Sequence, residues 1–174
     1  IMQLLSDNAS SEGEILWKKE NLLDYSEKQM RGIRGKELGL IFQNPLSALN
    51  PLFTIGNQLI ETIRLHHGLD KSSAKARAID LLKKVNISDP EARLEQYPHQ
   101  FSLGMCQRAM IAITLAMAPK LLIADEPSAS LDVTVQAQIM QLLKDLKSEF
   151  EMSILLISHD LGLISENCDY IYVM

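Results

Sequence analysis

The sequence has few of the features that mark disulfide-linked, membrane-spanning or nucleic-acid-binding proteins. Its two cysteines, Cys106 and Cys168, lie far apart and form no CxxC pair, which favours two reduced thiols over a metal site. No apolar run approaches the roughly 18 residues that a membrane span requires, and the polar stretch at residues 6–12 leaves no signal-peptide pattern. The net charge of −5 and the pI near 5.4 argue against a nucleic-acid-binding surface, which is usually basic.

The composition is that of an ordinary globular protein. With 174 residues, of which 47% are hydrophobic and 22% charged, the chain is long enough for one domain, or for one domain with a sub-domain. It begins at Ile1 in one apolar run and stops at Met174 in another, and such runs usually belong to helices or strands. We therefore expect these residues to be a piece of a longer polypeptide.

Residues 121–132, which read LLIADEPSASLD, indicate chemistry most strongly. Four apolar residues run into Asp125 and Glu126, and Pro127 ends the run, a pattern typical of a strand buried on both faces. The two acids would then lie at the carboxyl end of the strand, where open α/β sheets bind their ligands. Adjacent carboxylates are costly there without a cation, and Mg²⁺ on a nucleotide is the usual occupant. The alternative is an ordinary strand end with two solvated acids.

The order of predicted helices and strands indicates an α/β fold. The expected strands are residues 13–17, 38–42, 121–124, 153–157 and 169–174, and the expected helices outside residues 52–100 are 105–117, 133–150 and 161–166. Residues 1–5 look like the last turn of a helix that Asp7-Asn8 would end. Residues 52–100 have helical periodicity and form a helical block inserted between strands. Strands that alternate with helices predict βαβ units and a mostly parallel sheet.

Four short motifs follow one another along the chain. They are the segment FQNPLSALNP at residues 42–51, which contains Gln43, FSLGMCQR at 101–108, the acidic stretch 121–132, and ISHD at 157–160. In order and spacing they resemble the ATP-binding subunits of ABC transporters. YPH at residues 97–99 and DVTVQAQ at 132–138 resemble the oligopeptide/dipeptide permease branch, which includes nickel and metal-chelate importers. The resemblance covers nearly all of the chain.

The resemblance implies a role for each polar residue at the strand ends. The family's counterpart of Asp125 supports Mg²⁺, that of Glu126 acts as general base on the attacking water, and that of His159 contacts the γ-phosphate of ATP. Gln43 matches a glutamine that reaches Mg²⁺ or the attacking water. These roles agree with the needs of phosphoryl transfer, which are neutralised charge and an oriented nucleophile.

A second group of residues resembles the parts that act across a dimer. Ser102 and Gly104 match the signature motif, which closes over ATP held by the opposite subunit of a head-to-tail dimer, and Asp132, with Ser130-Leu131, matches the D-loop that crosses the interface. The family's common pattern has two glycines after the serine, whereas this chain has Leu103 before Gly104. A leucine adds a side chain and resists a positive φ where close backbone approach is expected. Either Leu103 weakens the signature site, or its side chain turns away without effect.

The phosphate loop G-x-x-x-x-G-K-[ST] does not occur in the 174 residues. In the family that loop lies just upstream of the segment that matches Ile1, so we expect the chain alone to bind ATP weakly or not at all and to be inactive. The expected fold is therefore α/β, with a P-loop NTPase-type, mostly parallel sheet that lacks its leading strand. Residues 1–51 and 101–174 would form the ATPase core, and residues 52–100 the inserted helical sub-domain.

The resemblance implies an ATP-hydrolysing subunit that energises uptake of oligopeptides, dipeptides or a related solute, with ATP and Mg²⁺ as cofactors. Its implied partners are transmembrane permease subunits contacted through the helical block and the Gln43 loop, a second ATP-binding subunit, and, indirectly, an extracytoplasmic solute-binding protein. It would lie peripherally on the cytoplasmic face of the cell membrane and bind no nucleic acid. Two alternatives stay open: an ABC ATPase outside transport, and a non-hydrolytic remnant or regulatory module.

Overall fold

The computed structural model describes residues 1–5, 9–129 and 131–174. In chain order its elements are β1 (Leu16–Trp17), β2 (Glu20–Asn21), the 3₁₀ turn η1 (Leu22–Asp24), α1 (Glu27–Ile33), β3 (Leu38–Ile41), α2 (Pro45–Ala48), α3 (Ile55–His67), α4 (Lys71–Lys84), α5 (Pro90–Arg93), the 3₁₀ turn η2 (Pro98–Gln100), α6 (Leu103–Leu115), β4 (Leu121–Asp125), α7 (Val133–Glu149), β5 (Ser153–Ile157) and α8 (Leu161–Asn167). Among these helices, none combines the length and the apolar character needed to span a bilayer.

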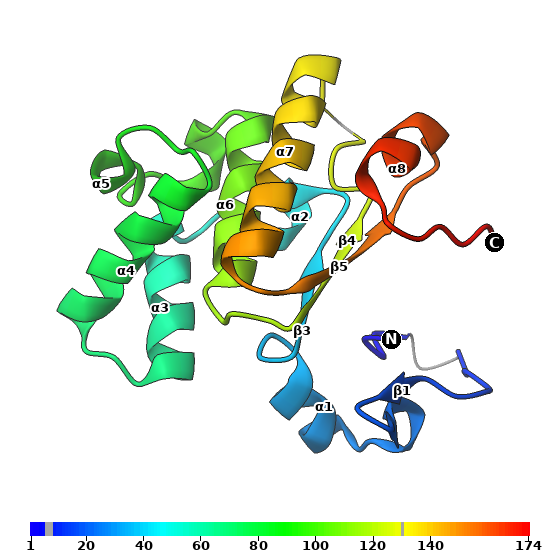
Figure 1. The fold of residues 1–174 in the computed structure, drawn as a ribbon. Coiled ribbons are helices and arrows are strands. Elements are labelled where there is room, and N and C mark those ends of the chain that lie inside the picture. Colours follow the sequence, from blue (N-terminus) through cyan, green and yellow to red (C-terminus); the bar gives the residue numbers. More distant parts are fainter. Residues whose placement is uncertain (6–8, 130) are drawn as a thin grey trace.

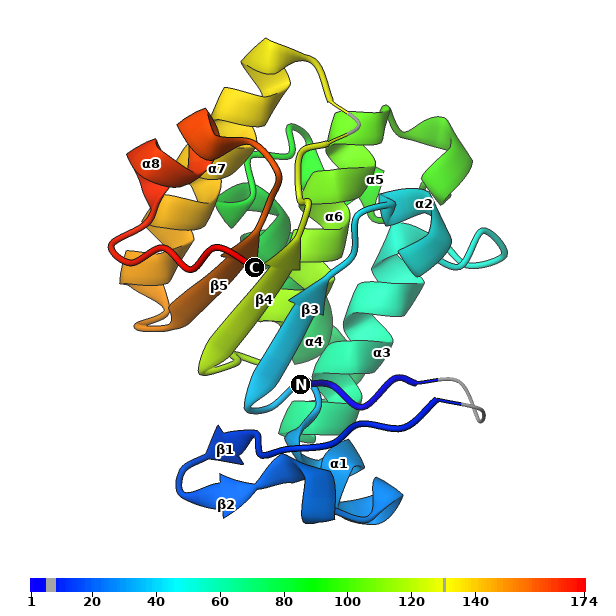
Figure 2. The same cartoon turned by 90° about the vertical axis from the view of Figure 1, so that its right-hand side faces the viewer.

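A three-stranded parallel sheet forms the centre of the molecule, which confirms the predicted α/β class. The strand order is β3-β4-β5, with Leu38 opposite Leu121 and Leu121 opposite Ser153. The middle strand, β4, has the continuous apolar run expected of a strand between two neighbours, and its residues Leu122, Ile123 and Ala124 are at most 4% exposed. Helices α6 and α7 cover one face of this sheet, as Figures 1 and 2 show.

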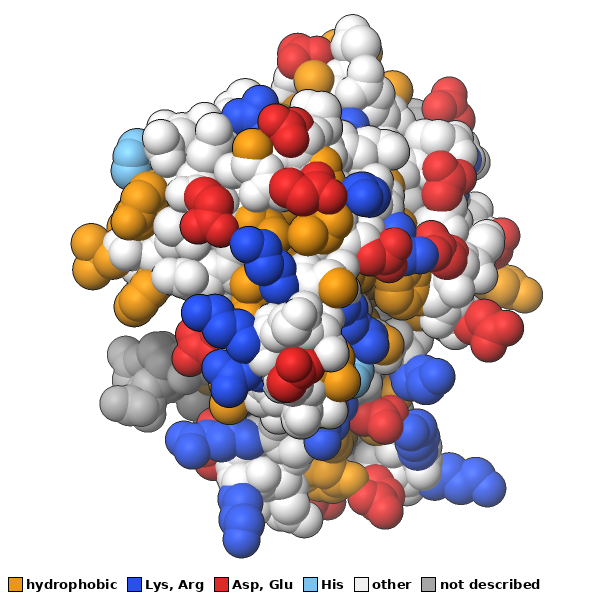
Figure 3. Space-filling model, turned by 90° about the vertical axis from the view of Figure 1, so that its left-hand side faces the viewer, with side chains coloured by type: hydrophobic (Ala, Val, Ile, Leu, Met, Phe, Trp, Pro, Cys, Tyr) orange, Lys and Arg blue, Asp and Glu red, His pale blue; other side chains and the backbone are white. Residues whose placement is uncertain are grey.

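Helices are present within residues 52–100, as the periodicity predicts, and α3 and α4 pack onto α6. The residues predicted on the apolar faces of α3 and α4 are buried except Ile60, which is half-buried; the buried ones are Ile55, Leu59, Ile63, Ala74, Ala78, Leu81, Leu82 and, at the C-cap of α4, Val85. These side chains belong to the same buried cluster as residues of α6, β4 and α7. Figure 1 shows the block beside α6, on the side away from β5. Figure 3 shows that its outer face mixes basic and acidic side chains, as a solvated surface does.

The first predicted strand, residues 13–17, was too long and its partner was missed. Only Leu16–Trp17 pairs, in an antiparallel hairpin with Glu20–Asn21. The two turn residues, Lys18 and Lys19, have φ values of 51° and 73°. A two-residue turn with both φ values positive usually contains Asn or Gly, so two lysines gave no turn signal.

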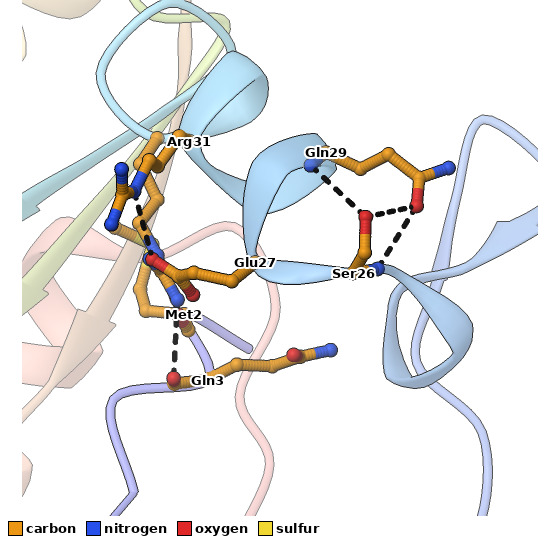
Figure 4. A network of polar contacts seen from close by, with 7 residues as sticks. Met2, Gln3, Ser26, Glu27, Gln29 and Arg31 are labelled. Atoms are coloured by element: carbon orange, nitrogen blue, oxygen red, sulfur yellow. Dashed lines mark hydrogen bonds and ion pairs between the residues drawn. The ribbon is translucent and has the colours of Figure 1, made fainter.

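The helical turn expected at residues 1–5 was wrong, because these residues have no regular secondary structure. Their carbonyl groups bond to a side chain instead: Arg34 Nε donates to Met2 O at 2.9 Å, and Arg34 Nη2 donates to Gln3 O at 3.1 Å. Figure 4 shows Met2 and Gln3 beside α1, which begins with a capping box between Ser26 and Gln29. Asp7-Asn8, the expected end of that helix, lie outside the described residues.

The strand expected at residues 169–174 was also wrong, because this segment has no regular secondary structure. It lies beside β5, where Tyr170 and Ile171 line a hollow of about 650 Å³ together with Leu155 and Ile157. A strand requires hydrogen bonds to a neighbouring backbone, and within the described part of the chain β5 pairs only with β4. Residues 169–174 lie beside β5 without forming these bonds, so this apolar run is not a strand.

Candidate functional site

The carboxyl ends of the three parallel strands bring the predicted site residues to one edge of the sheet. Ile41 of β3 lies opposite Ala124 of β4, and Asp125 lies opposite Ile157 of β5. Helices α6, α7 and α8 begin at this edge, because each packs along the sheet in the direction opposite to the strands (Figure 2). Their first turns are capped by Ser102, Asp132 and Asp160.

Glu126 and His159, which come from the loops after β4 and β5, are in direct contact. Glu126 Oε1 accepts a hydrogen bond from the backbone N–H of His159 at 3.0 Å and lies 2.6 Å from His159 Nδ1. The Glu126 side chain is 18% exposed and the imidazole 83% exposed. The hydrogen bond to the carboxylate, and then its negative charge, raise the pKa of His159 above its usual value. The sequence predicted both residues at this edge, but not their contact.

Glu126 adopts a left-handed backbone conformation with φ of 47°. This conformation costs a residue other than glycine about 1–2 kcal/mol. The hydrogen bond from Glu126 N–H to Ile157 O, at 3.0 Å, and the contacts of its carboxylate with His159 hold it in place. Strained residues of this kind are concentrated at functional sites.

Asp125 and Gln43 supply the remaining oxygen atoms at the edge. Asp125 is the exposed last residue of β4. Gln43 is exposed and lies two residues beyond Ile41, just as Glu126 lies two residues beyond Ala124, so the register places both on neighbouring loops. Within residues 1–5, 9–129 and 131–174, no three His, Cys, Asp or Glu side chains form a group that could hold a metal. Mg²⁺ bound to a nucleotide needs only one or two protein ligands, because phosphate oxygens and waters supply the others.

The beginning of α6 shows whether Leu103 strains the backbone. Ser102 caps this helix, and its hydroxyl oxygen accepts from the Met105 N–H at 3.3 Å. Leu103 is the first helical residue and has no positive φ, so its backbone is unstrained. Gly104 is the position with little room, since an added Cβ would lie 3.1 Å from Val135 Cγ1. Backbone strain at Leu103 therefore gives no reason for a weakened site.

Asp132 is exposed and caps α7, accepting from the N–H groups of Thr134 at 3.1 Å and Val135 at 3.0 Å. Its carboxylate thus satisfies two N–H groups in the first turn of α7. Ser130, the other polar residue predicted in this loop, lies outside the described residues.

Arg108 is a residue near the site whose importance the sequence did not reveal. Its guanidinium contacts Val85 O and Gln138 Oε1, which lie 23 and 30 positions away in the chain. Contacts at such separations leave no local pattern. The available signal was a charged residue inside the nearly apolar segment 105–117.

Comparison with known proteins places these features in a family. A family model described as ABC transporter matches residues 1–129. A putative peptide import ATP-binding protein of Brucella abortus (strain 2308) is 52% identical over 167 residues, which is 96% of this chain and 50% of that protein. The oligopeptide transport ATP-binding protein OppD of Bacillus subtilis (strain 168) is 50% identical over 162 residues, or 93% of this chain and 45% of that protein. The chain thus spans about half the length of these curated relatives.

Solved structures agree with this relationship. A dimeric ATP-binding cassette in a post-hydrolysis state, bound to ADP and Pi, is 29% identical and superposes with a TM-score of 0.76 over 88% of this chain and 65% of that one. A part of an ABC transporter complex from Clostridium perfringens is also 29% identical, with a TM-score of 0.77 over 91% and 61% of the two chains. With matching motifs, fold and relatives, the chain belongs to the ABC transporter family.

Proposed function

We propose that this chain is the nucleotide-hydrolysing portion of an importer subunit that uses ATP to take up oligopeptides or dipeptides. The contact between Glu126 and His159 beside Asp125 carries the proposal, because it joins a carboxylate base to an imidazole that can bind phosphate. The peptide substrate is supported by the names of relatives that are about 50% identical.

In this proposal Glu126 is the general base. Its Oε1 is engaged by His159, which leaves Oε2 to accept a proton from a water molecule. The exposed imidazole of His159 could turn toward the γ-phosphate of ATP, and Oε1 would then keep only its hydrogen bond from the backbone N–H of His159. Gln43, on the neighbouring loop, would orient the same water through its amide.

The residues at the edge suit Mg²⁺, which prefers oxygen ligands. Asp125 and Gln43 would hold it with a carboxylate and an amide oxygen. When bound, the ion neutralises charge on the phosphate oxygens.

Two further groups of residues would act across a dimer interface. Ser102 and Gly104 would face ATP held by a second subunit in a head-to-tail dimer, with the N–H groups of α6 directed at the γ-phosphate. Asp132 would lie at the same dimer interface. This arrangement is supported by the dimeric state of the related cassette bound to ADP and Pi.

The permease subunits would dock beside the Gln43 loop and the helical block at residues 52–100, while residues 1–51 and 101–174 form the core. Phe42, Leu46, Leu52 and Phe53 are 44%, 51%, 80% and 50% exposed. Hydrophobic side chains gather at one margin of the block's outer face in Figure 3. An exposed apolar group of this kind is typical of a protein interface. The subunit would then lie at the cytoplasmic face of the membrane and be linked only indirectly, through the permease subunits, to an extracytoplasmic solute-binding protein.

The test is a chimera in which this chain replaces the matching segment of the Bacillus subtilis OppD protein. We expect the chimera to hydrolyse ATP and to restore growth of an OppD-deficient strain on peptides. Loss of a general base costs about 100-fold or more in rate, so Glu126→Gln should abolish most hydrolysis while nucleotide still binds. Glu91→Gln, at an exposed glutamate of α5, is the matched control and should change nothing. A folded chimera without ATPase activity would overturn the proposal.

By itself, the 174-residue chain is expected to bind ATP weakly, because the N–H cradle of a phosphate loop is not in its sequence. Isothermal titration with ATP and Mg²⁺ checks this expectation, and tight binding would contradict it.

A further inference from the structure

The beginnings of α6 and α7 pack against each other in a fixed register. At the first turn, Gly104 lies so close to Val135 that an added Cβ would be 3.1 Å from Val135 Cγ1. About one turn further along both helices, Arg108 Nη2 donates to Gln138 Oε1 at 3.1 Å. From the first contact to the second, the residue numbers increase on both helices, so α6 and α7 run parallel where they touch. The ends that carry Ser102 and Asp132 are therefore held by one close contact and one hydrogen bond.

Arg108 also connects these two helices to the helical block. Its Nη1 donates to Val85 O at 3.0 Å, and Val85 is the fully buried residue that ends α4. The last carbonyl groups of a helix have no partner within the helix, and a buried carbonyl without a partner costs free energy. Arg108 supplies that partner, while partial burial lowers the pKa of its guanidinium.

We infer that Arg108 is a positioning residue for the proposed reaction: it fixes the axial register of α6 against α7 and joins both helices to the end of the helical block. The inference rests on the proposed function, in which Ser102 and Gly104 act together with Asp132 across a dimer. Only arginine suits this position, because its planar fork presents donors to two acceptors at a fixed angle, whereas lysine is a flexible point charge.

A second contact between the helical block and α7 provides a matched control. Lys84, the neighbour of Val85, pairs with Glu149 at the far end of α7. Both side chains are partly solvated, 30% and 46% exposed. This pair joins α4 directly to α7, the two helices that Arg108 connects through α6. It does not touch the helix ends that carry Ser102 and Asp132.

The test uses the OppD chimera with Arg108→Lys, Gln138→Leu, the double variant, Gln138→Glu and Lys84→Ala. A small displacement of reacting groups costs one to two orders of magnitude in rate, so Arg108→Lys and Gln138→Leu should each lower kcat about tenfold. The double variant should be no worse than Arg108→Lys alone, because that substitution already removes the contact with Gln138 that Gln138→Leu removes. Affinity for nucleotide should stay within about twofold, since the phosphate loop is elsewhere. Gln138→Glu keeps the acceptor and should retain kcat, as should Lys84→Ala.

Hydrogen exchange gives a readout that does not depend on hydrolysis. Arg108→Lys should accelerate exchange in the first turns of α6 and α7, whereas Lys84→Ala should affect only the end of α7. Unchanged exchange at residues 103–106 and 133–136, or a parallel loss of kcat and nucleotide affinity, would overturn the inference. If the unsubstituted chimera hydrolyses no ATP, the proposed function fails, and the exchange comparison still decides whether Arg108 sets the register.

Discussion

At the scale of single residues, Glu126 shows how backbone and side chain are fixed together. Its left-handed φ of 47° is unfavourable for a glutamate, and its carboxylate is held by two donors of His159. A glycine would relieve the strain but would provide no carboxylate for His159 to contact.

The same contact predicts a pH dependence of stability. The pKa of His159 is raised in the folded state by its hydrogen bond to Glu126. The stabilisation is therefore fully present below about pH 6.5, the usual histidine pKa, and is lost as the pH rises through the folded-state value. Urea unfolding should show that the difference in free energy of unfolding between the protein and His159→Asn decreases from about pH 6 to about pH 9.

His66 provides a control of opposite sign. Burial, and then the positive charges of Lys36 and His67, lower the pKa of His66. Charging this ring is less favourable in the folded state, so the protein should lose stability relative to His66→Asn as the pH falls below about 6.5. The same slope for both histidines would contradict these assignments.

Ala118 predicts a stabilising substitution. This exposed residue follows α6 with φ of 52°, and its N–H donates to Leu115 O at 2.9 Å. Glycine removes about 1–2 kcal/mol of backbone strain from the folded state. It also raises the conformational entropy of the unfolded chain, which offsets part of that gain. Ala118→Gly should therefore raise the free energy of unfolding by roughly 0.5–1 kcal/mol. Ala137→Gly, at an exposed position inside α7, should lower it by about 1 kcal/mol; thermal unfolding compares the two.

At the scale of elements, local patterns predicted most of the fold because the apolar periodicity matched the burial. The strand at β5 agrees with its prediction at both ends, and α7 ends one residue earlier than expected. Elements that depend on distant partners were not predictable in this way. The segment at 169–174 is apolar enough for a strand but forms no ladder with β5, beside which it lies. Residues 1–5 are held by the side chain of Arg34.

The candidate site was predictable to a similar degree. Asp125, Glu126 and His159 follow predicted strands, so the parallel sheet alone brings them to one edge. The contact of Glu126 with His159 depends on a positive φ that a Glu-Pro sequence does not indicate. The double contact of Arg108 depends on how α4, α6 and α7 pack, which no local pattern encodes.

Gly56 predicts a destabilising substitution at the beginning of α3. It lies in the first turn of α3, its N–H donates to Leu94 O at 2.9 Å, and an added Cβ would lie 2.5 Å from that oxygen. The backbone carbonyl of Leu94 cannot move aside as the end of a flexible side chain can. Gly56→Ala should therefore lower the free energy of unfolding by about 1–3 kcal/mol. Gly32→Ala, in the exposed part of α1 with nothing within 4 Å, should instead be neutral or stabilising. Chemical denaturation of both variants checks the contrast.

At the scale of the whole molecule, the outer edge of β5 predicts self-association of the 174-residue chain. Within the described residues this edge has no strand partner, and Leu155 and Ile157 on β5 are 37% and 46% exposed. Exposed apolar edge strands pair with other chains unless a charge interrupts them. Light scattering should show concentration-dependent association that Leu155→Lys reduces. Leu65→Lys, at a leucine of α3 that is 75% exposed, should leave association unchanged.

The shared buried cluster of the helical block, α6, β4 and α7 has a consequence for cooperativity. Because one apolar core joins the block to the sheet, neither can unfold first without exposing the other, and both should belong to a single cooperative unit. The N-terminal cluster around Leu22, Met30 and Leu38 is separate from that core, so it can open in a sub-global event while the strand ends stay ordered. A movement of the helical block relative to the sheet must then be a shear within an intact core. It would shift many side chains by small amounts instead of turning about a single hinge.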